Sequence, residues 1–420
     1  MTPARAPLKP LDIALTELLA QVSTLAGVDE VSTFDADGRV LAQNMLSSLH
    51  VPPQDNSSMD GYAMRAADVG VAGAVLSVSQ RIPAGSVGTP LQAGTAARIF
   101  TGASIPAGAD AVVMQEECEV LPDANGASQI RVNTLLTSGQ WIRRAGEDVA
   151  LGAVVLRQGE RLTPASLGLA ASIGLATLPL VRRPKVALFS TGDELVMPGD
   201  IAPQDMPAGS IYNSNRFFLR ALLMRLGCEV TDMGIVPDNL DATKAALRSA
   251  AEGHDLILTS GGVSVGEEDH IKPAVQALGE LNLWQIAIKP GKPFAYGKVK
   301  NATDSAHFIG LPGNPVSSFV TFLLLVRPFL LKLQGVQDVD QIATKSIPVR
   351  ADFVWSRADK RREFLRVKRN ANGGLDLFPN QSSGVLTSAV WGDGLVNNPP
   401  GQTIAIGDMV QFVSFAELLS

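Results

Sequence analysis

The sequence predicts a multidomain α/β protein whose centre is a doubly wound, mostly parallel sheet. Between about residues 182 and 328, apolar strand-like runs alternate with amphipathic helical segments, a pattern typical of βα units. Shorter Val/Ile/Ala runs broken by Gly and Pro fill residues 47–149 and the chain beyond about residue 331, and they indicate β-rich domains. At 420 residues, the chain is also too long for one ordinary core.

The central region yields an explicit list of expected elements. Strands are expected at 185–190, 228–235, 255–260, 283–288, 294–298 and 307–310, and helices at 213–226, 241–252, 269–278 and 314–330. In the last region, strands are expected at 345–351, 362–368, 375–378 and 408–413. Because ligands of open α/β sheets bind outside the carboxyl ends of the strands, the loops at those ends become the candidate site.

The N-terminal segment predicts an amphipathic helix, because leucines and valines recur at helical spacing from Leu11 to Leu25. Residues 150–181 are expected to form a connecting segment that packs with this helix. The apolar run 316–326 resembles a membrane span, but Arg327 and Lys332 interrupt it before the roughly 20 residues that a span needs. We therefore expect no membrane partner.

Composition excludes several classes of protein. Hydrophobic residues make up 46% and charged residues 18% of the chain, which favours a folded protein over a disordered one. A formal charge of −6 argues against a nucleic-acid partner. Cys118 and Cys228 lie far apart without a CxxC motif, so neither a zinc site nor a disulfide framework is expected, and a cytoplasmic location fits best.

Loops rich in polar residues, glycine and proline follow the expected strands at the predicted carboxyl edge of the sheet. They are Ser190, Thr191, Gly192, Asp193 and Glu194; Asp238; Ser260, Gly261, Gly262, Ser264 and Asp269; Lys289 and Lys292; and Pro312, Gly313, Asn314 and Pro315. One such loop alone is weak evidence, whereas several that converge on one edge predict a binding site.

Each loop has a chemical interpretation beside a structural one. The Gly261–Gly262 turn lets backbone N–H groups approach an anion, although an ordinary tight turn would have the same sequence. Asn314 and Pro315 open a helix whose N-terminus favours phosphate, although simple capping also explains them.

Charged side chains complete the candidate site. Asp193, Glu194, Asp238 and Asp269 could hold Mg²⁺ beside substrate phosphates, with Asp238 and Asp269 as the candidate ligands; the alternative is a solvated surface. Lys289 and Lys292, in a loop stiffened by prolines, would supply positive charge for a small oxyanion, unless they belong to an exposed hairpin.

A second group of glycine-adjacent polar residues lies in the β-rich region 47–149. It includes Asp60 in NSSMDGYA (56–63), Thr101 in TGA (101–103) and Asp148 in RRAGED (143–148). Taken by themselves, these segments are best interpreted as turns.

Together, these strings resemble the molybdopterin molybdenumtransferase family, which includes the C-terminal part of gephyrin. The further matching motifs are STGDEL (190–195), SGGVSVGEED (260–269), IKPGKPFAYG (288–297) and GLPGNPVSS (310–318). They occur in order over all but the C-terminal quarter of the chain. Three positions depart from the family pattern: Asn213 stands in place of Asp, His270 in place of an aromatic residue, and Ser58 in place of alanine.

The resemblance implies four domains. They are a helical linker domain (1–46 plus 150–181), an inserted β-rich domain (47–149), a doubly wound molybdopterin-binding α/β domain (182–330) and a β-barrel-like C-terminal domain (331–420). It also implies a homodimer whose cleft lies between the α/β domain of one subunit and the inserted domain of its partner. Asp60, Thr101 and Asp148 would line the inserted-domain side of that cleft.

The implied activity is insertion of molybdate into adenylylated molybdopterin, with release of AMP and with Mg²⁺ as cofactor. The residues implied on the α/β side are Glu194, Asp238, Asp269, Lys289, Lys292, Pro312 and Pro315. Molybdopterin adenylyltransferase and acceptor molybdoenzymes are candidate protein partners. Two alternative functions remain open from the sequence: adenylylation of molybdopterin by ATP, and a non-catalytic scaffold like gephyrin.

Overall fold

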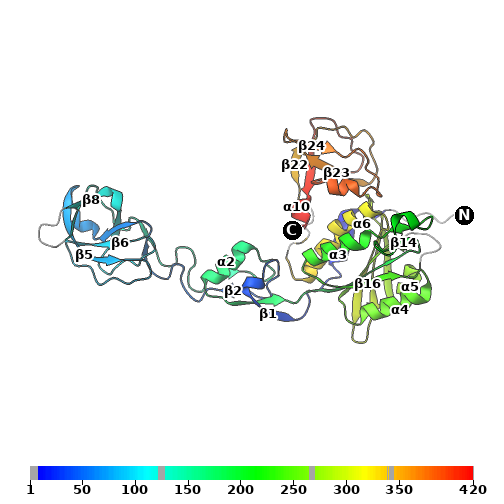
Figure 1. The fold of residues 1–420 in the computed structure, drawn as a ribbon, viewed down its shortest axis with the longest axis horizontal. Coiled ribbons are helices and arrows are strands. Elements are labelled where there is room, and N and C mark those ends of the chain that lie inside the picture. Colours follow the sequence, from blue (N-terminus) through cyan, green and yellow to red (C-terminus); the bar gives the residue numbers. More distant parts are fainter. Residues whose placement is uncertain (1–7, 122–127, 264–269, 338, 340–344, 420) are drawn as a thin grey trace.

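The computed structural model describes residues 8–121, 128–263, 270–337, 339 and 345–419. The molecule is strongly elongated (Figure 1). The inserted β-rich domain occupies one end, the linker domain lies in the middle, and the α/β and C-terminal domains lie at the other end. Residues of the inserted domain are therefore remote from the α/β domain within one chain.

The α/β domain contains a six-stranded sheet of order β16-β13-β17-β21-β20-β18. Its strands are β13 (Lys185–Thr191), β16 (Glu229–Val236), β17 (Leu256–Ser260), β18 (Gly279–Gln285), β20 (Pro293–Lys300) and β21 (Ser305–Leu311). Its helices are α3 (Asn215–Arg225), α4 (Leu240–Ala251), α5 (Ile271–Leu278), α6 (Pro315–Thr321) and α7 (Arg327–Leu333), with a π-helical segment (Phe322–Val326) between the last two. The four strands β16, β13, β17 and β21 are parallel, whereas β20 and β18 add antiparallel pairs at one edge. The expected strand at 283–288 is displaced, because β18 begins at Gly279 and ends at Gln285.

The register of this sheet brings the strand ends to one rim. Thr191 pairs with Val236, and Ser260 pairs with Leu311, so the carboxyl ends of the four parallel strands lie side by side. Because β20 runs in the opposite direction, its first residue, Pro293, belongs to the same rim. A short parallel pair, β14 (Leu195–Val196) with β15 (Ile211–Tyr212), extends from this rim before α3 begins.

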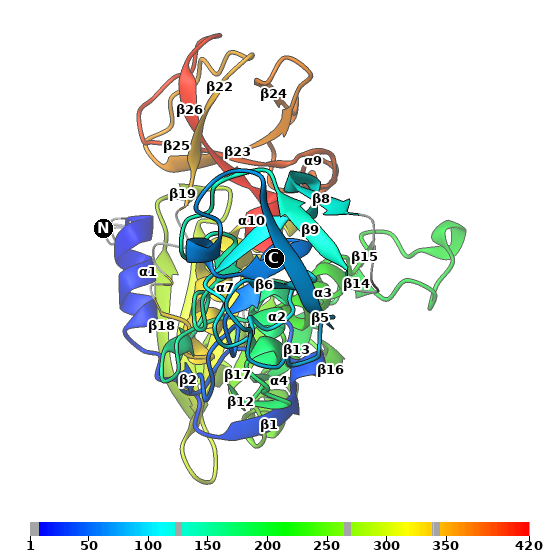
Figure 2. The same cartoon turned by 90° about the vertical axis from the view of Figure 1, so that its left-hand side faces the viewer.

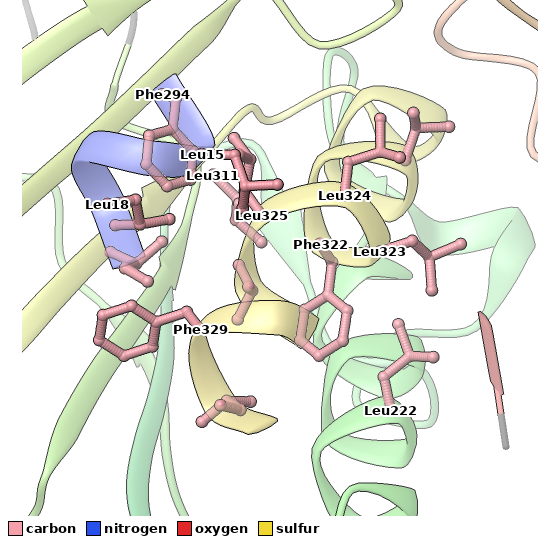
Figure 3. Close-up of a cluster of buried hydrophobic side chains, with 14 of the residues drawn as sticks. Leu15, Leu18, Leu222, Phe294, Leu311, Phe322, Leu323, Leu324, Leu325 and Phe329 are labelled. Atoms are coloured by element: carbon pink, nitrogen blue, oxygen red, sulfur yellow. The ribbon is translucent and has the colours of Figure 1, made fainter. Parts of the chain in front are cut away.

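The N-terminal helix α1 (Leu11–Leu19) packs on the α/β domain, so our expectation that it packs with residues 150–181 is wrong. Leu15 and Leu18 are buried in the same cluster as Phe329, and Figure 3 shows them facing the sheet and the helical run of residues 315–333. The chain just before α1 is also held by the sheet edge, because Lys9 N–H donates to the Gln285 carbonyl at 2.7 Å. The sheet face offers a larger apolar surface than the small linker core, and burial of the helix stripe there removes more apolar area from water.

The linker domain joins two segments that are distant in sequence. Its elements are β1 (Val28–Ser32), the 3₁₀ turn Thr33–Asp35, β2 (Met45–Leu46), β11 (Val154–Leu156), α2 (Pro164–Ser172) and β12 (Thr177–Val181). β1 pairs with β12 and β2 pairs with β11, both antiparallel. A small core that includes Leu41, Leu162 and Leu180 lies between them. The domain thus forms a narrow connection between the two ends of the molecule.

The inserted domain is a six-stranded sheet of order β7-β4-β6-β5-β9-β8. Its elements are β3 (Asn56–Ser57), β4 (Gly61–Met64), β5 (Ala74–Ile82), β6 (Thr95–Ile99), β7 (Ala111–Met114), β8 (Cys118–Leu121), β9 (Gln129–Val132) and β10 (Ile142–Arg143), with 3₁₀ turns at Ala66–Asp68 and Gln115–Glu117. The sheet encloses its own apolar core, which includes Met64, Ile82 and Ile130. β3 pairs with β10 and holds the loop beyond residue 143 beside the loop that leads to Asp60.

The C-terminal domain is a curled sheet of order β19-β23-β25-β26-β22, with β24 beside β23. Its elements are β19 (Ile288–Lys289), β22 (Ile347–Arg350), β23 (Arg362–Arg369), β24 (Leu375–Leu377), α9 (Thr387–Trp391), β25 (Gly394–Asn398), β26 (Met409–Ser414) and α10 (Phe415–Leu419). An isolated bridge between Ala351 and Leu375 joins the two sides, which gives the expected barrel-like form. β25 lies outside the strands expected from the sequence, and β19 leaves the α/β domain to pair with β23 (Figure 2).

One helical run, Pro315–Leu333, is long and apolar enough to cross a membrane by length and composition alone. Its mean hydropathy is 1.8, yet 89% of the run is buried inside the protein. Phe329 lies on the side of the run that faces Leu18 of α1, and Phe322 lies on the side of Leu222 in α3 (Figure 3). The run is therefore a core helix of the α/β domain, as the interruption by Arg327 predicts.

Candidate functional site

A cavity of about 820 Å³ opens at the carboxyl rim of the α/β sheet. This volume is within the roughly 300 to 1,000 Å³ typical of small-molecule sites. Of the residues predicted for the site, the cavity is lined by Thr191, Gly192, Glu194, Asp238, Ser260, Gly261, Gly262, Pro312, Gly313, Asn314 and Pro315. The loops after β13, β16, β17 and β21 thus meet around one space, which is what the strand alternation predicts.

Close packing between two of these loops explains the glycine at position 261. Gly261 has φ +93°, and a Cβ at this position would lie 2.8 Å from the Thr191 carbonyl oxygen. Its N–H donates to the Leu311 carbonyl at 3.0 Å, so it joins the loops of β13, β17 and β21. Only glycine combines this left-handed backbone with so close an approach.

Two carboxylates, Glu194 and Asp238, line the cavity. Asp193 lies outside the lining but fixes the loop after β16, since its carboxylate accepts the N–H of Asp238 at 3.3 Å. No lysine or arginine is among the lining residues in the part of the chain that the structure describes. A phosphate-bearing ligand in this cavity would therefore meet negative charge without a protein cation to offset it.

This charge distribution tests whether the residues fit Mg²⁺. The described residues contain no group of three or more His, Cys, Asp or Glu side chains that could hold a metal ion by themselves. Mg²⁺ is usually bound by one or two carboxylates plus substrate phosphates, and the pair of Glu194 and Asp238 in an acidic cavity fits that mode. The other expected ligand, Asp269, lies outside the described residues, as does Ser264.

Three predicted residues lie behind or beside the cavity. Ser190 is fully buried in β13 and does not line it. Lys292 is half-buried in the loop before β20, where its carbonyl accepts the Ile286 N–H at 2.7 Å, and its ammonium has no hydrogen bond or ion pair with another described residue. Lys289 faces the C-terminal domain instead.

The charge of Lys289 is shared with two acidic side chains of the C-terminal domain. Its ammonium lies 3.0 Å from Glu363 Oε1 and 3.6 Å from Asp359 Oδ2. Glu363 is only 1% exposed and also accepts the Trp355 indole N–H at 2.7 Å. The guanidinium of Arg361 and the Lys289 ammonium hold the pKa of Asp359 well below its usual range. Lys289 therefore joins the α/β domain to the C-terminal domain.

Asp60 and Thr101 lie together on an exposed turn of the inserted domain. The backbone N–H and the hydroxyl of Thr101 both donate to Asp60 Oδ1 at 2.8 Å. These bonds, with that from the backbone as the larger cause, lower the pKa of Asp60 below its ordinary value. The Asp60 carboxylate is therefore ionised and held in one direction.

Asp148 lies on the exposed RRAGED loop of the same domain. Its N–H donates to the Val51 carbonyl at 3.0 Å, while Asp55 accepts hydrogen bonds from Ala145 and Arg144 at 2.9 and 2.6 Å. The loop is thus fixed to the segment that leads to Asp60. In one chain, this whole region lies at the far end of the molecule from the cavity (Figure 1).

Part of the cavity wall was missed from the sequence. It comes from the excursion between β13 and α3, and its residues are Leu195, Ile211, Tyr212, Asn213, Ser214 and Asn215. Tyr212 fixes this excursion by donating from its hydroxyl to the Ile201 carbonyl at 2.7 Å. Helical periodicity predicts a helix over 213–226, but it says nothing about where the excursion before that helix folds.

Comparison with known protein families gives three consecutive matches. Residues 9–174 match the family described as "MoeA N-terminal region (domain I and II)". Residues 187–332 match "Probable molybdopterin binding domain", and residues 348–415 match "MoeA C-terminal region (domain IV)". The cavity lies within the second of these matches.

Individual relatives agree with this result. A protein of Haemophilus influenzae named "Molybdopterin molybdenumtransferase" is 45% identical over 329 residues, which cover 77% of this chain and 78% of the relative. A protein of Synechococcus elongatus with the same name is 34% identical over 418 residues, with coverage of 95% and 97%. A crystal structure described as the molybdopterin biosynthesis moeA protein from Pyrococcus horikoshii is similar with a TM-score of 0.83 and 28% identity, covering 97% of this chain and 100% of that one.

Proposed function

Because the chain belongs to the molybdopterin molybdenumtransferase family, we propose that it inserts molybdate into adenylylated molybdopterin and releases AMP. The observation that carries this proposal is the cavity at the carboxyl rim, where acidic and glycine-bearing loops converge. Two dithiolene sulfurs replace one oxygen of molybdate, which leaves as water after taking up two protons. A water molecule cleaves the phosphoanhydride to AMP and the pterin phosphate, and molybdenum keeps its oxidation state.

The protein's contribution is mainly to hold the reacting groups in place. The Gly261–Gly262 turn lines the space where the phosphates would lie, and the hydrogen bond from the Gly261 N–H to the Leu311 carbonyl holds that turn in place. We assign Mg²⁺ to Asp238 and Asp269, with Glu194 lining the same cavity as Asp238, where the ion would offset the phosphate charge and polarise the anhydride. Lys292 is the lysine we assign to molybdate, since Lys289 shares its charge with Glu363.

The metal assignment can be tested apart from turnover. We expect AMP to bind the full chain at least tenfold more tightly with Mg²⁺ than with EDTA, measured by isothermal titration. Asp238→Asn should remove most of that difference, because the amide no longer offsets the cation. Equal AMP affinity in Mg²⁺ and EDTA would contradict the assignment.

We also propose that a homodimer completes the site. Asp60, Thr101 and Asp148 lie on exposed turns far from the cavity of their own chain, so only a second copy could bring them to it (Figure 1). An arrangement in which each cavity faces the partner's inserted domain is consistent with two-fold symmetry. In this arrangement, the elongated shape produced by the linker domain places each inserted domain at the partner's cavity.

The decisive experiment is a molybdate-dependent AMP-release assay with complementing variants. Asp60→Ala and Glu194→Ala chains should each be inactive alone, and an equal mixture refolded or co-expressed should recover about a quarter of wild-type turnover, because half of the dimers carry one intact site. No recovery, with both variants folded, would contradict the shared site. AMP release that needs molybdate would separate this activity from adenylylation by ATP, and its absence in the wild-type chain would overturn the proposed function.

A further inference from the structure

Two asparagines at the start of α3 form an unexplained polar wall of the cavity. Asn213 is 2% exposed and Asn215 is 7% exposed, and both line the cavity. Each carries one polar side-chain atom that is buried and has no hydrogen-bond partner among the described residues: Nδ2 of Asn213 and Oδ1 of Asn215. Because buried polar groups are nearly always paired in native proteins, two such atoms on side chains of residues that line one cavity point to a ligand.

The orientation of the Asn213 amide is fixed by the helix that follows. Its Oδ1 accepts the backbone N–H of Arg216 at 3.2 Å, at the N-terminus of α3. If the amide were flipped, two N–H donors would face each other, so the oxygen must remain on the helix side. The Nδ2 group consequently stays on the other side and offers a donor.

In Asn215, the side-chain nitrogen is the bonded atom and the oxygen is the atom without a partner. Its Nδ2 donates to Ser260 Oγ at 3.0 Å and to the Gly313 carbonyl at 2.7 Å. Both partners belong to rim loops, so the side chain ties α3 to the ends of β17 and β21. A flipped amide would place its oxygen against the Gly313 carbonyl, and the free Oδ1 is therefore an acceptor.

We infer that Asn213 and Asn215 bind the edge of a planar heterocycle in the substrate, with a donor from Asn213 and an acceptor from Asn215. Phosphate oxygens only accept hydrogen bonds, so they could pair with Asn213 but would leave Asn215 unpaired. An edge with an acceptor beside an N–H donor satisfies both atoms. The pterin lactam and the adenine amino edge each have this pattern, and the identity of the heterocycle rests on the proposed function.

This assignment gives the substrate a direction in the cavity. The heterocycle edge lies at the start of α3, and the phosphates lie toward the Gly261–Gly262 turn. An aspartate at position 213 would still cap α3 with one oxygen, but its other oxygen would present an acceptor and a negative charge. The Asn213 found in this chain therefore offers the ligand a hydrogen-bond donor where an aspartate would offer an acceptor.

The test uses the Asn213→Asp variant, which keeps the helix-capping oxygen and replaces only the free donor. AMP, molybdopterin and inorganic pyrophosphate are titrated into the full chain, and pyrophosphate reports the effect of charge alone. The control is Asn44→Asp in the linker domain, where Oδ1 accepts the Gln158 N–H at 2.8 Å and the added charge lies outside the cavity. Circular dichroism confirms that each variant is folded.

We expect Asn213→Asp to weaken AMP or molybdopterin binding at least tenfold while pyrophosphate affinity changes less than threefold; whichever probe responds identifies the heterocycle. Asn44→Asp should change none of the three. Equal weakening of all three probes, no change in any of them, or a wild-type chain that binds only pyrophosphate would overturn the inference. If the three probes bind as expected but the wild-type chain shows no molybdate-dependent AMP release, the proposed function is overturned instead.

Discussion

The α/β cavity and the Asp60 turn carry similar residues but meet their hydrogen-bonding needs in different ways. Both combine carboxylates with neighbouring glycines. At the cavity, buried polar atoms of Asn213 and Asn215 have no partner among the described residues. At the turn, Asp60 accepts two hydrogen bonds from Thr101 and remains exposed.

This difference separates a preformed binding site from a surface that needs a partner. A concave wall with unpaired polar atoms is stabilised when a ligand pairs them. An exposed turn that is already internally bonded binds little by itself and can act only against an opposing surface.

Gly261→Val should have the largest effect. The new side chain would approach the Thr191 carbonyl and impose strain at φ +93°, so we expect a loss of AMP-release turnover on the order of 100-fold from displacement of the rim loops. Gly234→Ala is the matched control, because Gly234 also has positive φ (+85°) but nothing lies within 4 Å of its Cβ position. The control should lose about 1 to 2 kcal/mol in free energy of unfolding and keep its turnover. Equal losses of turnover in both variants would show that backbone strain, and not the cavity wall, is responsible.

Lys289→Met should destabilise the contact between the α/β and C-terminal domains. The variant leaves Glu363, which is 1% exposed, without its cation, and we expect a loss of about 2 kcal/mol in the free energy of unfolding, measured with urea. Adding Glu363→Gln should recover more than half of that loss, because the unpaired charge is removed. If Lys289→Met instead leaves stability unchanged and abolishes turnover, Lys289 acts on the substrate and the functional assignment from the sequence is right.

Thr101→Val should have a small, local effect. The hydroxyl bond to Asp60 is lost while the backbone bond remains, so the pKa of Asp60 should rise only part of the way toward 3.8, measured by an NMR titration of its carboxyl carbon. Since the folded pKa of Asp60 is lowered, its stabilising contribution is present above pH 3.8 and is lost as the pH falls through the folded value. An unchanged pKa would mean that the backbone N–H alone orients the carboxylate.

Much of the rim was predictable because parallel sheets place their carboxyl ends together. The alternation of strands and helices located Thr191, Asp238, Ser260 and Pro312 at one edge without any coordinates. The wall formed by Asn213 and Asn215 was not predictable, because it depends on how an irregular excursion folds back over the rim. Likewise, β25 was missed, since its polar residues and flanking prolines weaken the strand signal.

The sequence by itself determined the βα order, the β-rich flanks and the residues of the carboxyl rim, since periodicity and turn chemistry are local properties, and its family resemblance supplied the four-domain organisation. Only the tertiary structure decided that α1 packs on the α/β core, that Lys289 pairs with Glu363, and that Asp60 lies far from the cavity of its own chain. Those outcomes depend on which surfaces bury the most apolar area and which charges meet across domains. Such contacts join residues distant in sequence, and no local pattern records them.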